Sequence, residues 1–313
     1  MKGRSVVAIL TLALASAAIA ARGGDVRIDG RDVYPESLDA DRAGRLYIGS
    51  IQGIVYRTDP DGDVARAWIT PSAANGLLSV LGVLVDARAR MLWVCSSPMP
   101  LRVPPAVGAS ALVGFDLRTG ALRARYPLPG ARAACNDIAI DRDGALFVTD
   151  TPQGRILALR PGATALSLFA EEAGLKGVDG IAFAGDGKLY VNSVSANAMF
   201  RVERGAGGAF AGLAALALSQ PVAGPDGLRP IGGSRFLQAE GGSGKVTLVT
   251  IAGDRADIAD IRTGLASSPG VAPARGRAYA VEGKISYLFD PKLKGQDPGP
   301  FAARALELPT DVH

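Results

Sequence analysis

A unit of two short strands joined by a tight turn recurs along this chain, and its repetition limits the fold more than any other feature. The clearest copy is residues 134–150, in which strands at 138–141 and 145–149 flank an Asp143-Gly144 turn. The matching turns lie near residues 44, 89, 144, 187, 233 and 276. This spacing of about 45 residues, stretched once by a Pro-rich insertion at 97–110, is typical of β-propellers.

Each unit continues with two further β-branched or apolar runs, so the sequence predicts an all-β fold. We expect a six-bladed β-propeller with four antiparallel strands per blade, in a ring that closes because a lone blade cannot bury both faces. The Ala-rich stretches 163–175 and 211–218 are expected to be outer strands or loops. In the sixth unit we expect strands at 271–274, 277–282, 284–290 and 302–308. A β-sandwich would require the regular spacing to be accidental.

The first twenty residues have the pattern of a secretory signal peptide and lack the repeating strand pattern of the rest of the chain. Lys2 and Arg4 precede an apolar run at 6–19, and Ala18-Ile19-Ala20 is a cleavage signal. The run is shorter than the roughly 20 residues of a membrane-spanning helix. We therefore expect residues 1–20 to be removed, residues 21–313 to form a single domain, and the product to be secreted or periplasmic, with no membrane attachment after cleavage.

Charge and histidine content exclude several classes of function. The net charge is +4 and the arginines are scattered rather than clustered in sequence, so we expect no nucleic-acid partner, and we expect a monomer. The only histidine is His313. This argues against Ser-His-Asp and Cys-His catalysis and against His-rich zinc sites.

The two cysteines, Cys95 and Cys135, are too few for a disulfide-rich scaffold or a four-cysteine zinc site. Cys95 ends the second strand of its unit, and Cys135 opens the first strand of the next. Both positions fall on one face of a propeller, so a disulfide is geometrically feasible. Two separate buried thiols are the alternative.

Acidic and amide residues open the first strands of several units. In a propeller these strands line the central channel, so their opening residues converge. The residues are Glu36, Asn136 with Asp137, Asp179 and Asp226. At about 4 Å each carboxylate pair would repel by about 4 kcal/mol at an effective dielectric of 20. Either the side chains point apart, or a cation lies between them. Hard oxygen ligands favour Ca²⁺, then Mg²⁺ or Mn²⁺, with Zn²⁺ as a further alternative.

The same residues carry a resemblance to a known family. Pro35-Glu36-Ser37, Asn136-Asp137-Ile138, Val178-Asp179-Gly180 and Pro225-Asp226-Gly227 are similar to motifs of the six-bladed propellers that include gluconolactonase, senescence marker protein and luciferin-regenerating enzyme. The first motif is equally similar to that of strictosidine-synthase-like propellers. Asp179 departs from the family, in which asparagine is common at this position.

The resemblance implies one divalent metal, usually calcium, with Glu36, Asp179 and Asp226 as direct ligands. Asn136 or Asp137 would be a ligand or hold substrate and water, and we favour Asn136 as the residue that faces the channel. Asp226 would double as the catalytic general base. A substrate-clamping arginine is not evident, and Arg132 and Arg229 are the nearest candidates.

These observations and the resemblance predict a metal-dependent hydrolase of a small-molecule lactone or related ester, with calcium as the favoured metal. A metal polarises the carbonyl, and a metal-bound carboxylate is a weak base that suits an activated ester. A non-enzymatic propeller that binds a ligand or a protein is one alternative. A strictosidine-synthase-like enzyme that forms C–C bonds is another, with Glu240 or Glu282 as its catalytic glutamate.

Overall fold

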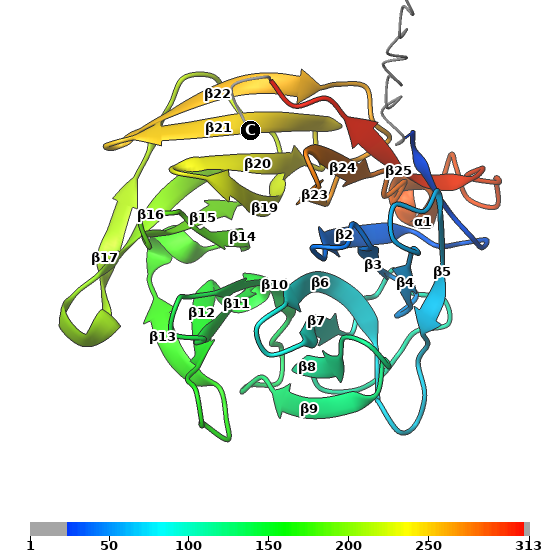
Figure 1. Cartoon of the computed structure of the whole chain (residues 1–313), viewed down its shortest axis with the longest axis horizontal. Coiled ribbons are helices and arrows are strands. Elements are labelled where there is room, and N and C mark those ends of the chain that lie inside the picture. Colours follow the sequence, from blue (N-terminus) through cyan, green and yellow to red (C-terminus); the bar gives the residue numbers. More distant parts are fainter. Residues whose placement is uncertain (1–23, 310–313) are drawn as a thin grey trace, which may run out of the picture.

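The computed structural model describes residues 24–309, and it is an all-β structure built from repeated four-stranded sheets (Figure 1). The expected signal peptide at residues 1–20 and His313 lie outside the described residues. Within residues 24–309, no helix has the length and apolar character needed to cross a membrane.

Four of the sheets each follow one continuous stretch of chain. The second repeat contains β6 (Ser79–Asp86), β7 (Met91–Ser97), β8 (Ala111–Asp116) and β9 (Leu122–Pro127). The third contains β10 (Cys135–Ile140), β11 (Leu146–Asp150), β12 (Arg155–Leu159) and β13 (Ser167–Glu171). The fourth contains β14 (Val178–Phe183), β15 (Leu189–Ser193), β16 (Ala198–Arg204) and β17 (Phe210–Ala215). The fifth contains β19 (Pro225–Gly232), β20 (Arg235–Glu240), β21 (Lys245–Ala252) and β22 (Arg255–Arg262), with β18 (Ala217–Leu218) added at its outer edge.

The first and last repeats are joined in one eight-stranded sheet. The first repeat contains β2 (Pro35–Ala40), β3 (Leu46–Ser50), β4 (Val55–Arg57) and β5 (Val64–Ile69), and the last contains β23 (Val271–Ala274), β24 (Arg277–Val281) and β25 (Phe301–Leu306). Between them lies β1 (Val26–Ile28), which pairs antiparallel with β25 and parallel with β5. The amino-terminal strand therefore connects the two ends of the chain.

The predicted third strand of the sixth unit was wrong, whereas the predicted fourth strand at 302–308 is present as β25 but occupies the third position. Residues 284–290 hold the short helix α1 (Ser286–Phe289) instead of a strand, and β25 is the third strand beside β24. The outer position belongs to β1. Local periodicity could not reveal this, because the partner comes from the other end of the chain. The Ala-rich stretches do contain outer strands, β13, β17 and β18, and short 3₁₀ turns lie at Thr151–Gln153, Ala173–Leu175 and Ala206–Gly208.

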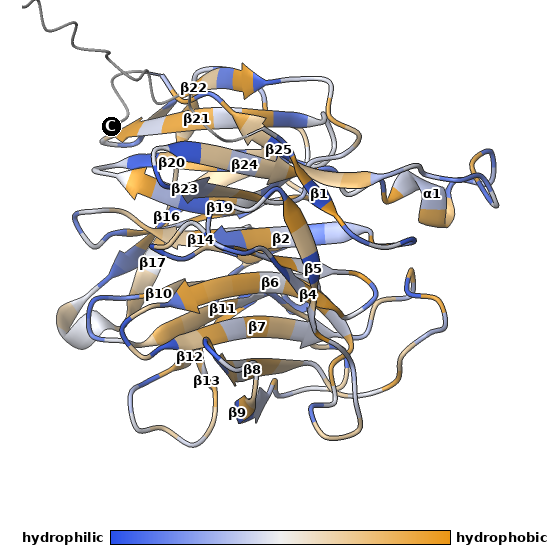
Figure 2. Ribbon diagram, turned by 45° about the vertical axis from the view of Figure 1, so that its right-hand side comes forward, coloured by the Kyte–Doolittle hydropathy of each residue, from blue (hydrophilic) through white to orange (hydrophobic). Residues whose placement is uncertain are grey.

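The first strand of each repeat lies near the centre of the molecule. Within the described residues, β2, β6, β10, β14, β19 and β23 contact one another in that order, and β23 returns to β2 (Figure 1). The apolar core lies between neighbouring sheets, as in the edge-to-face contact of Phe147 with Phe183, whose ring centroids are 5.4 Å apart. Figure 2 shows that hydrophobic residues concentrate in the strands and hydrophilic ones in the connections.

A disulfide between Cys95 in β7 and Cys135 in β10 joins the second and third repeats. The two residues are 40 positions apart, and both side chains are fully buried. The Pro-rich insertion after β7 is an exposed loop, as the sequence predicts, and its Val107 is 97% exposed.

Removal of the disulfide should lower stability measurably. The cross-link closes a loop of about 40 residues, and the loss of unfolded-chain entropy is worth about 4 kcal/mol. We expect the Cys95→Ala/Cys135→Ala variant to unfold at a lower urea concentration than the oxidised wild type, followed by circular dichroism. Reduced wild type should resemble the variant. Equal midpoints for all three proteins would contradict this expectation.

Candidate functional site

The polar residues at the heads of the inner strands sit at irregularities in strand pairing. The register shifts between Pro35 and Ser37 in β2, between Cys135 and Ile138 in β10, between Val178 and Ile181 in β14, and between Pro225 and Leu228 in β19. A β-bulge re-aims the side chains of the strand that contains it. The residues that fall inside these shifts are the ones that the sequence analysis selected: Glu36, Asn136, Asp137, Asp179 and Asp226.

The inner strands approach one another closely at the bulges, which explains the Asp-Gly pairs. A Cβ atom on Gly180 would lie 2.2 Å from the carbonyl oxygen of Asp226. Asn192 in β15 then fixes this contact, since it accepts a hydrogen bond from the Gly180 amide at 2.8 Å and donates one to the Asp226 carbonyl at 2.7 Å. Thus Gly180 lets two acidic strand heads lie side by side, and Asn192 holds them there.

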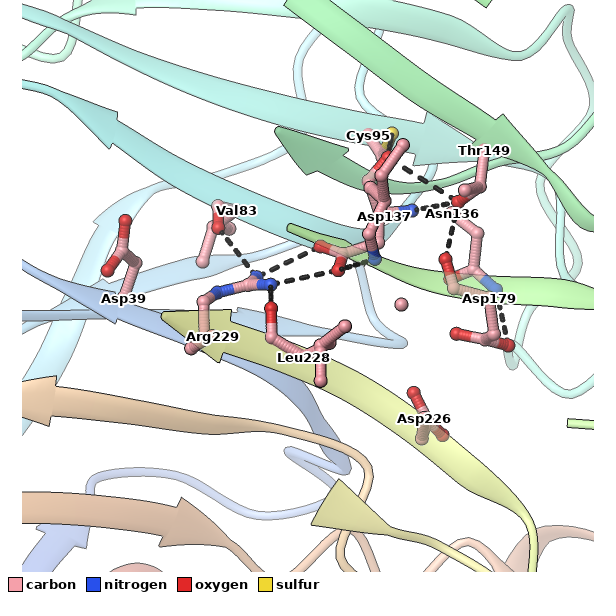
Figure 3. Close-up of polar contacts among 12 residues, drawn as sticks. Asp39, Val83, Cys95, Asn136, Asp137, Thr149, Asp179, Asp226, Leu228 and Arg229 are labelled. Carbon is pink, nitrogen blue, oxygen red and sulfur yellow. Dashed lines mark hydrogen bonds and ion pairs between the residues drawn. The ribbon is translucent and has the colours of Figure 1, made fainter. Parts of the chain in front are cut away.

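Three carboxyl groups at this end of the inner strands lie near enough to influence one another's pKa values. Asp179 of β14 and Asp226 of β19 lie next to each other, as Figure 3 shows, and each affects the pKa of the other. Glu36 of β2 is close enough for repulsion by Asp179 to raise its pKa. Asp179 is 5% exposed, whereas Glu36 and Asp226 keep some accessible surface. We call Glu36, Asp179, Asp226 and Asn136 the acidic cluster.

Burial and mutual repulsion shift the proton affinity of the cluster upward. Loss of solvation, followed by the charge of Asp137, raises the pKa of Asp179 to about 7. Loss of solvation, then the charges of Asp179 and Glu36, hold the pKa of Asp226 well above its ordinary value. The pKa of Glu36 is likewise well above its ordinary value, mainly through burial and then through Asp179. Without a compensating cation the cluster therefore retains protons near neutral pH.

Asn136 is the member of its pair that reaches the acidic cluster. Its side-chain nitrogen donates to an Asp179 carboxylate oxygen at 2.9 Å and to the Thr151 hydroxyl at 2.8 Å (Figure 3). The Thr151 hydroxyl in turn donates to the Val178 carbonyl at 2.6 Å. The amide of Asn136 is therefore tied to both the side chain and the backbone of the β14 head.

Asp137 points the other way and forms a buried ion pair with Arg229. The two terminal nitrogens of Arg229 donate to the two carboxylate oxygens of Asp137 at 2.8 and 2.9 Å (Figure 3). Asp137 also accepts from the Ile181 amide at 3.1 Å. Arg229 donates further to the carbonyls of Leu228 at 2.8 Å and Val83 at 3.2 Å. This one ion pair thus connects β6, β10, β14 and β19 at the centre.

Asp39 lies on the far side of Arg229 (Figure 3). Burial raises the pKa of Asp39, and the charge of Arg229 opposes that rise. The Val85 amide donates to Asp39 at 2.7 Å. The Nε atom of Arg229 is buried without a hydrogen-bond partner within the described residues. Arg229 is therefore a cation surrounded by Asp39, Asp137 and, more distantly, Glu36.

Within residues 24–309, no three His, Cys, Asp or Glu side chains are gathered tightly enough to form a group that could hold a metal ion. Arg132 is exposed in the turn before β10, and its side chain makes no hydrogen bond or ion pair with a described residue. Glu240 accepts from the Ala223 amide at 3.0 Å, and Glu282 accepts from Arg304 at 2.5 Å. These two glutamates are engaged in local structure.

Sequence reasoning missed the roles of Arg229 and Asp39, although the repeats contain a signal. The position after the strand-head residue is serine in the first repeat, aspartate in the third and glycine in the other four: Ser37, Gly82, Asp137, Gly180, Gly227 and Gly270. Two positions further along each strand, Asp39 and Arg229 replace the apolar residues of the other repeats. Charged residues of opposite sign at one repeat position would have suggested an ion pair at the axis.

Replacing one partner of the buried Asp137–Arg229 pair should lower the free energy of unfolding far more than replacing both partners together. Loss of one partner leaves a buried charge unpaired, which costs about 3–5 kcal/mol of stability. Replacement of both partners by apolar residues is often nearly neutral. We expect Asp137→Leu and Arg229→Met each to lower the free energy of unfolding in urea strongly, and the double variant to lose less than the sum.

The exposed pair Arg27–Asp29, whose side chains are 55% and 53% exposed, provides the control. Arg27→Met should change the free energy of unfolding by less than about 1 kcal/mol. Strictly additive losses in the Asp137/Arg229 double variant would show that the ion pair is not coupled.

Comparison with known proteins gives structural but not sequence relatives. No family model matches the chain, and no curated protein matches its sequence. Among solved structures, the calcium-binding protein regucalcin from Agrobacterium tumefaciens is 16% identical, with a TM-score of 0.66 over 91% of this chain and 95% of the other. A putative gluconolactonase is 16% identical, with a TM-score of 0.63 over 92% and 94%.

A virginiamycin B lyase from Staphylococcus aureus is also similar, at 14% identity and a TM-score of 0.59 over 91% of this chain and 98% of the lyase. At these identities the likeness concerns the fold. The predicted resemblance to the gluconolactonase and luciferin-regenerating enzyme group is confirmed at that level, and the chain has the β-propeller fold that these proteins share.

Proposed function

We propose that this protein is a metal-dependent hydrolase of a lactone or related carboxylic ester. The observation that carries the proposal is the acidic cluster, in which three mutually repelling carboxyl groups and one amide open the inner strands of a gluconolactonase-like fold. Such a cluster costs stability and needs a function to explain it.

Calcium is the cation that the cluster suits best, followed by Mg²⁺, Mn²⁺ and Zn²⁺. The available donors are carboxylate and amide oxygens, without imidazole or thiolate. Glu36, Asp179 and Asp226 would be the direct ligands, and Asn136 would complete the set by turning its amide oxygen inward. A bound cation would polarise the substrate carbonyl and so stabilise the negative charge that develops on it.

Asp226 is the proposed general base. A nearby cation lowers the pKa of a carboxyl group, so Asp226 would lose the proton that burial makes it retain. Its carboxylate could then take a proton from the attacking water, with the reactivity of a weak base suited to an activated ester. Asn136 would orient the substrate, the exposed Arg132 is the proposed arginine contact to it, and Asp137 would contribute indirectly through its pair with Arg229.

We further propose a six-bladed propeller closed by β1, because β1 supplies the fourth strand to the last repeat. The signal-peptide pattern supports a secreted or periplasmic monomer.

A propeller that binds a ligand without chemistry is the competing function, and activity measurements separate the two. The lyase group is less favoured. One of its structures is described as a catalytically inactive variant with a histidine replaced by alanine, whereas the only histidine here is His313.

Hydrolysis of a panel of lactones should depend on the cation and on Asp226. We expect chelation to abolish activity, added Ca²⁺ to restore it, and Asp226→Asn to lower kcat at least about 100-fold, since general-base catalysis contributes that much. Asp143→Asn, in the exposed turn of the third repeat, is the matched control and should retain activity. A rate of lactone hydrolysis that changes neither with the chelator nor in the Asp226→Asn variant would overturn the proposal.

The acidic cluster should make the metal-free protein less stable as the pH rises. Asp179 titrates near pH 7 in the folded chain and near 4 in the unfolded chain, so the folded state binds more protons between these values. We expect the free energy of unfolding in urea to fall from pH 5 to pH 8 and Ca²⁺ to reverse the loss at pH 8. Calcium affinity, measured by calorimetry, should weaken as the pH drops below 7. A calcium affinity that is independent of pH would contradict this assignment.

A further inference from the structure

A second candidate site lies at the opposite end of the inner strands from the acidic cluster. Glu36 is the second residue of β2, whereas a pocket of about 280 Å³ opens beyond the other end of β2, between the first and second repeats. Its lining is rich in arginine and contains one carboxylate: Asp41, Arg45, Tyr47, Arg57, Arg90, Leu117 and Arg118. We call it the arginine pocket.

The single carboxylate of the arginine pocket is already occupied by its own turn. Asp41 accepts from the amides of Ala43 at 2.9 Å and Arg45 at 3.0 Å, and from the Tyr47 hydroxyl at 3.2 Å. Arg45 also reaches it at 3.3 Å. Asp41 thus neutralises Arg45 and leaves the other three guanidinium groups without a counter-charge.

Those three guanidinium groups have no anionic partner among residues 24–309. The side chains of Arg57, Arg90 and Arg118 make no hydrogen bond or ion pair there. Arg57 stacks over the Trp68 ring at 4.3 Å from its centroid, which limits its orientation. Arg90 is held at a positive φ of 56° in the β6–β7 turn, an uncommon conformation for a long side chain. Arg118 begins the turn between β8 and β9.

Another pocket between repeats shows that an excess of arginine over acidic lining residues is not a general property of the fold. A pocket of about 240 Å³ between the third and fourth repeats is lined by two arginines and two aspartates, Arg142, Arg204, Asp141 and Asp143. There Arg204 pairs with Asp141 at 3.3 Å. The arginine pocket instead carries an excess of three positive charges among its lining residues.

We propose that the arginine pocket binds a small, multiply charged oxyanion of the phosphate or sulfate ester class. Planar guanidinium groups donate paired hydrogen bonds to tetrahedral oxyanions, and three unpaired cations around one volume favour a ligand with more than one negative charge. This site is independent of the proposed hydrolase activity, because it lies on the other end of the strands and shares no residue with the acidic cluster.

Trp68 gives a direct reporter, because a ligand that recruits Arg57 must alter the cation–π contact. The chain has two tryptophans, and Trp93 has a buried indole nitrogen without a partner within the described residues, so Trp93→Phe should be tolerated. In this background the fluorescence of Trp68 would be titrated with pyrophosphate, sulfate and acetate. The buffer would lack divalent cations, so that no metal recruits the anion to the acidic cluster.

We expect saturable binding of pyrophosphate, weaker binding of sulfate, and almost none of acetate, with affinity falling as ionic strength rises. Arg90→Gln/Arg118→Gln should weaken pyrophosphate binding at least about tenfold, since each lost charged hydrogen bond is worth that much. The control, Arg42→Gln/Arg66→Gln, removes the same charge from exposed positions outside the pocket and should change the affinity less than twofold.

Two results would overturn the proposal. One is the absence of a saturable response to pyrophosphate, confirmed by calorimetry in the wild type. The other is an equal loss of affinity in the pocket and control variants, which would show that net charge alone attracts the anion. Circular dichroism of both double variants would verify that they are folded, so that a loss of binding reports on the pocket.

Discussion

The ion pair between Arg229 and Asp137 is the interaction on which the centre of this structure depends. It is bidentate and almost fully excluded from water, and its hydrogen bonds reach four inner strands. A buried charge pair is weak evidence for stability in itself, because desolvation offsets the attraction. Its consequence here is geometric. The pair draws β6, β10, β14 and β19 together at one point, and it keeps Asp137 away from the acidic cluster beside it.

That separation gives the centre two electrostatic environments along the same strands. Asp39, Asp137 and Arg229 form a zone in which the cation compensates the acids. Glu36, Asp179 and Asp226 form a zone in which burial and then mutual repulsion raise the pKa values of the acids. Among the described residues, only the zone of Glu36, Asp179 and Asp226 lacks a paired cationic side chain such as the one that Arg229 provides to Asp137. This difference is the reason why the proposed metal site is placed at the strand heads.

The two ends of the inner strands then differ in sign. The acidic cluster, where we propose a cation, lies at one end, and the arginine pocket presents unpaired guanidinium groups at the other. Both sites use positions that a repeat fold supplies many times, namely strand heads and hairpin turns. In both cases a change of residue type in one or two repeats, rather than a change of backbone, creates the site. Such substitutions are one way in which a repetitive fold can acquire separate sites on a common scaffold.

The sequence by itself determined the all-β class, nearly all the inner and second strands, and the acidic residues at the strand heads. These features are local, because strand period, turn residues and bulge positions are encoded within a few residues of each other. The tertiary structure decided which partner each polar side chain meets. Asn136 contacts Asp179 and Asp137 contacts Arg229, 92 positions away. It also decided that β1 completes the last repeat and that three arginines from separate hairpins share one pocket. Such contacts join distant parts of the chain, so their geometry exists only after the ring of strands has closed.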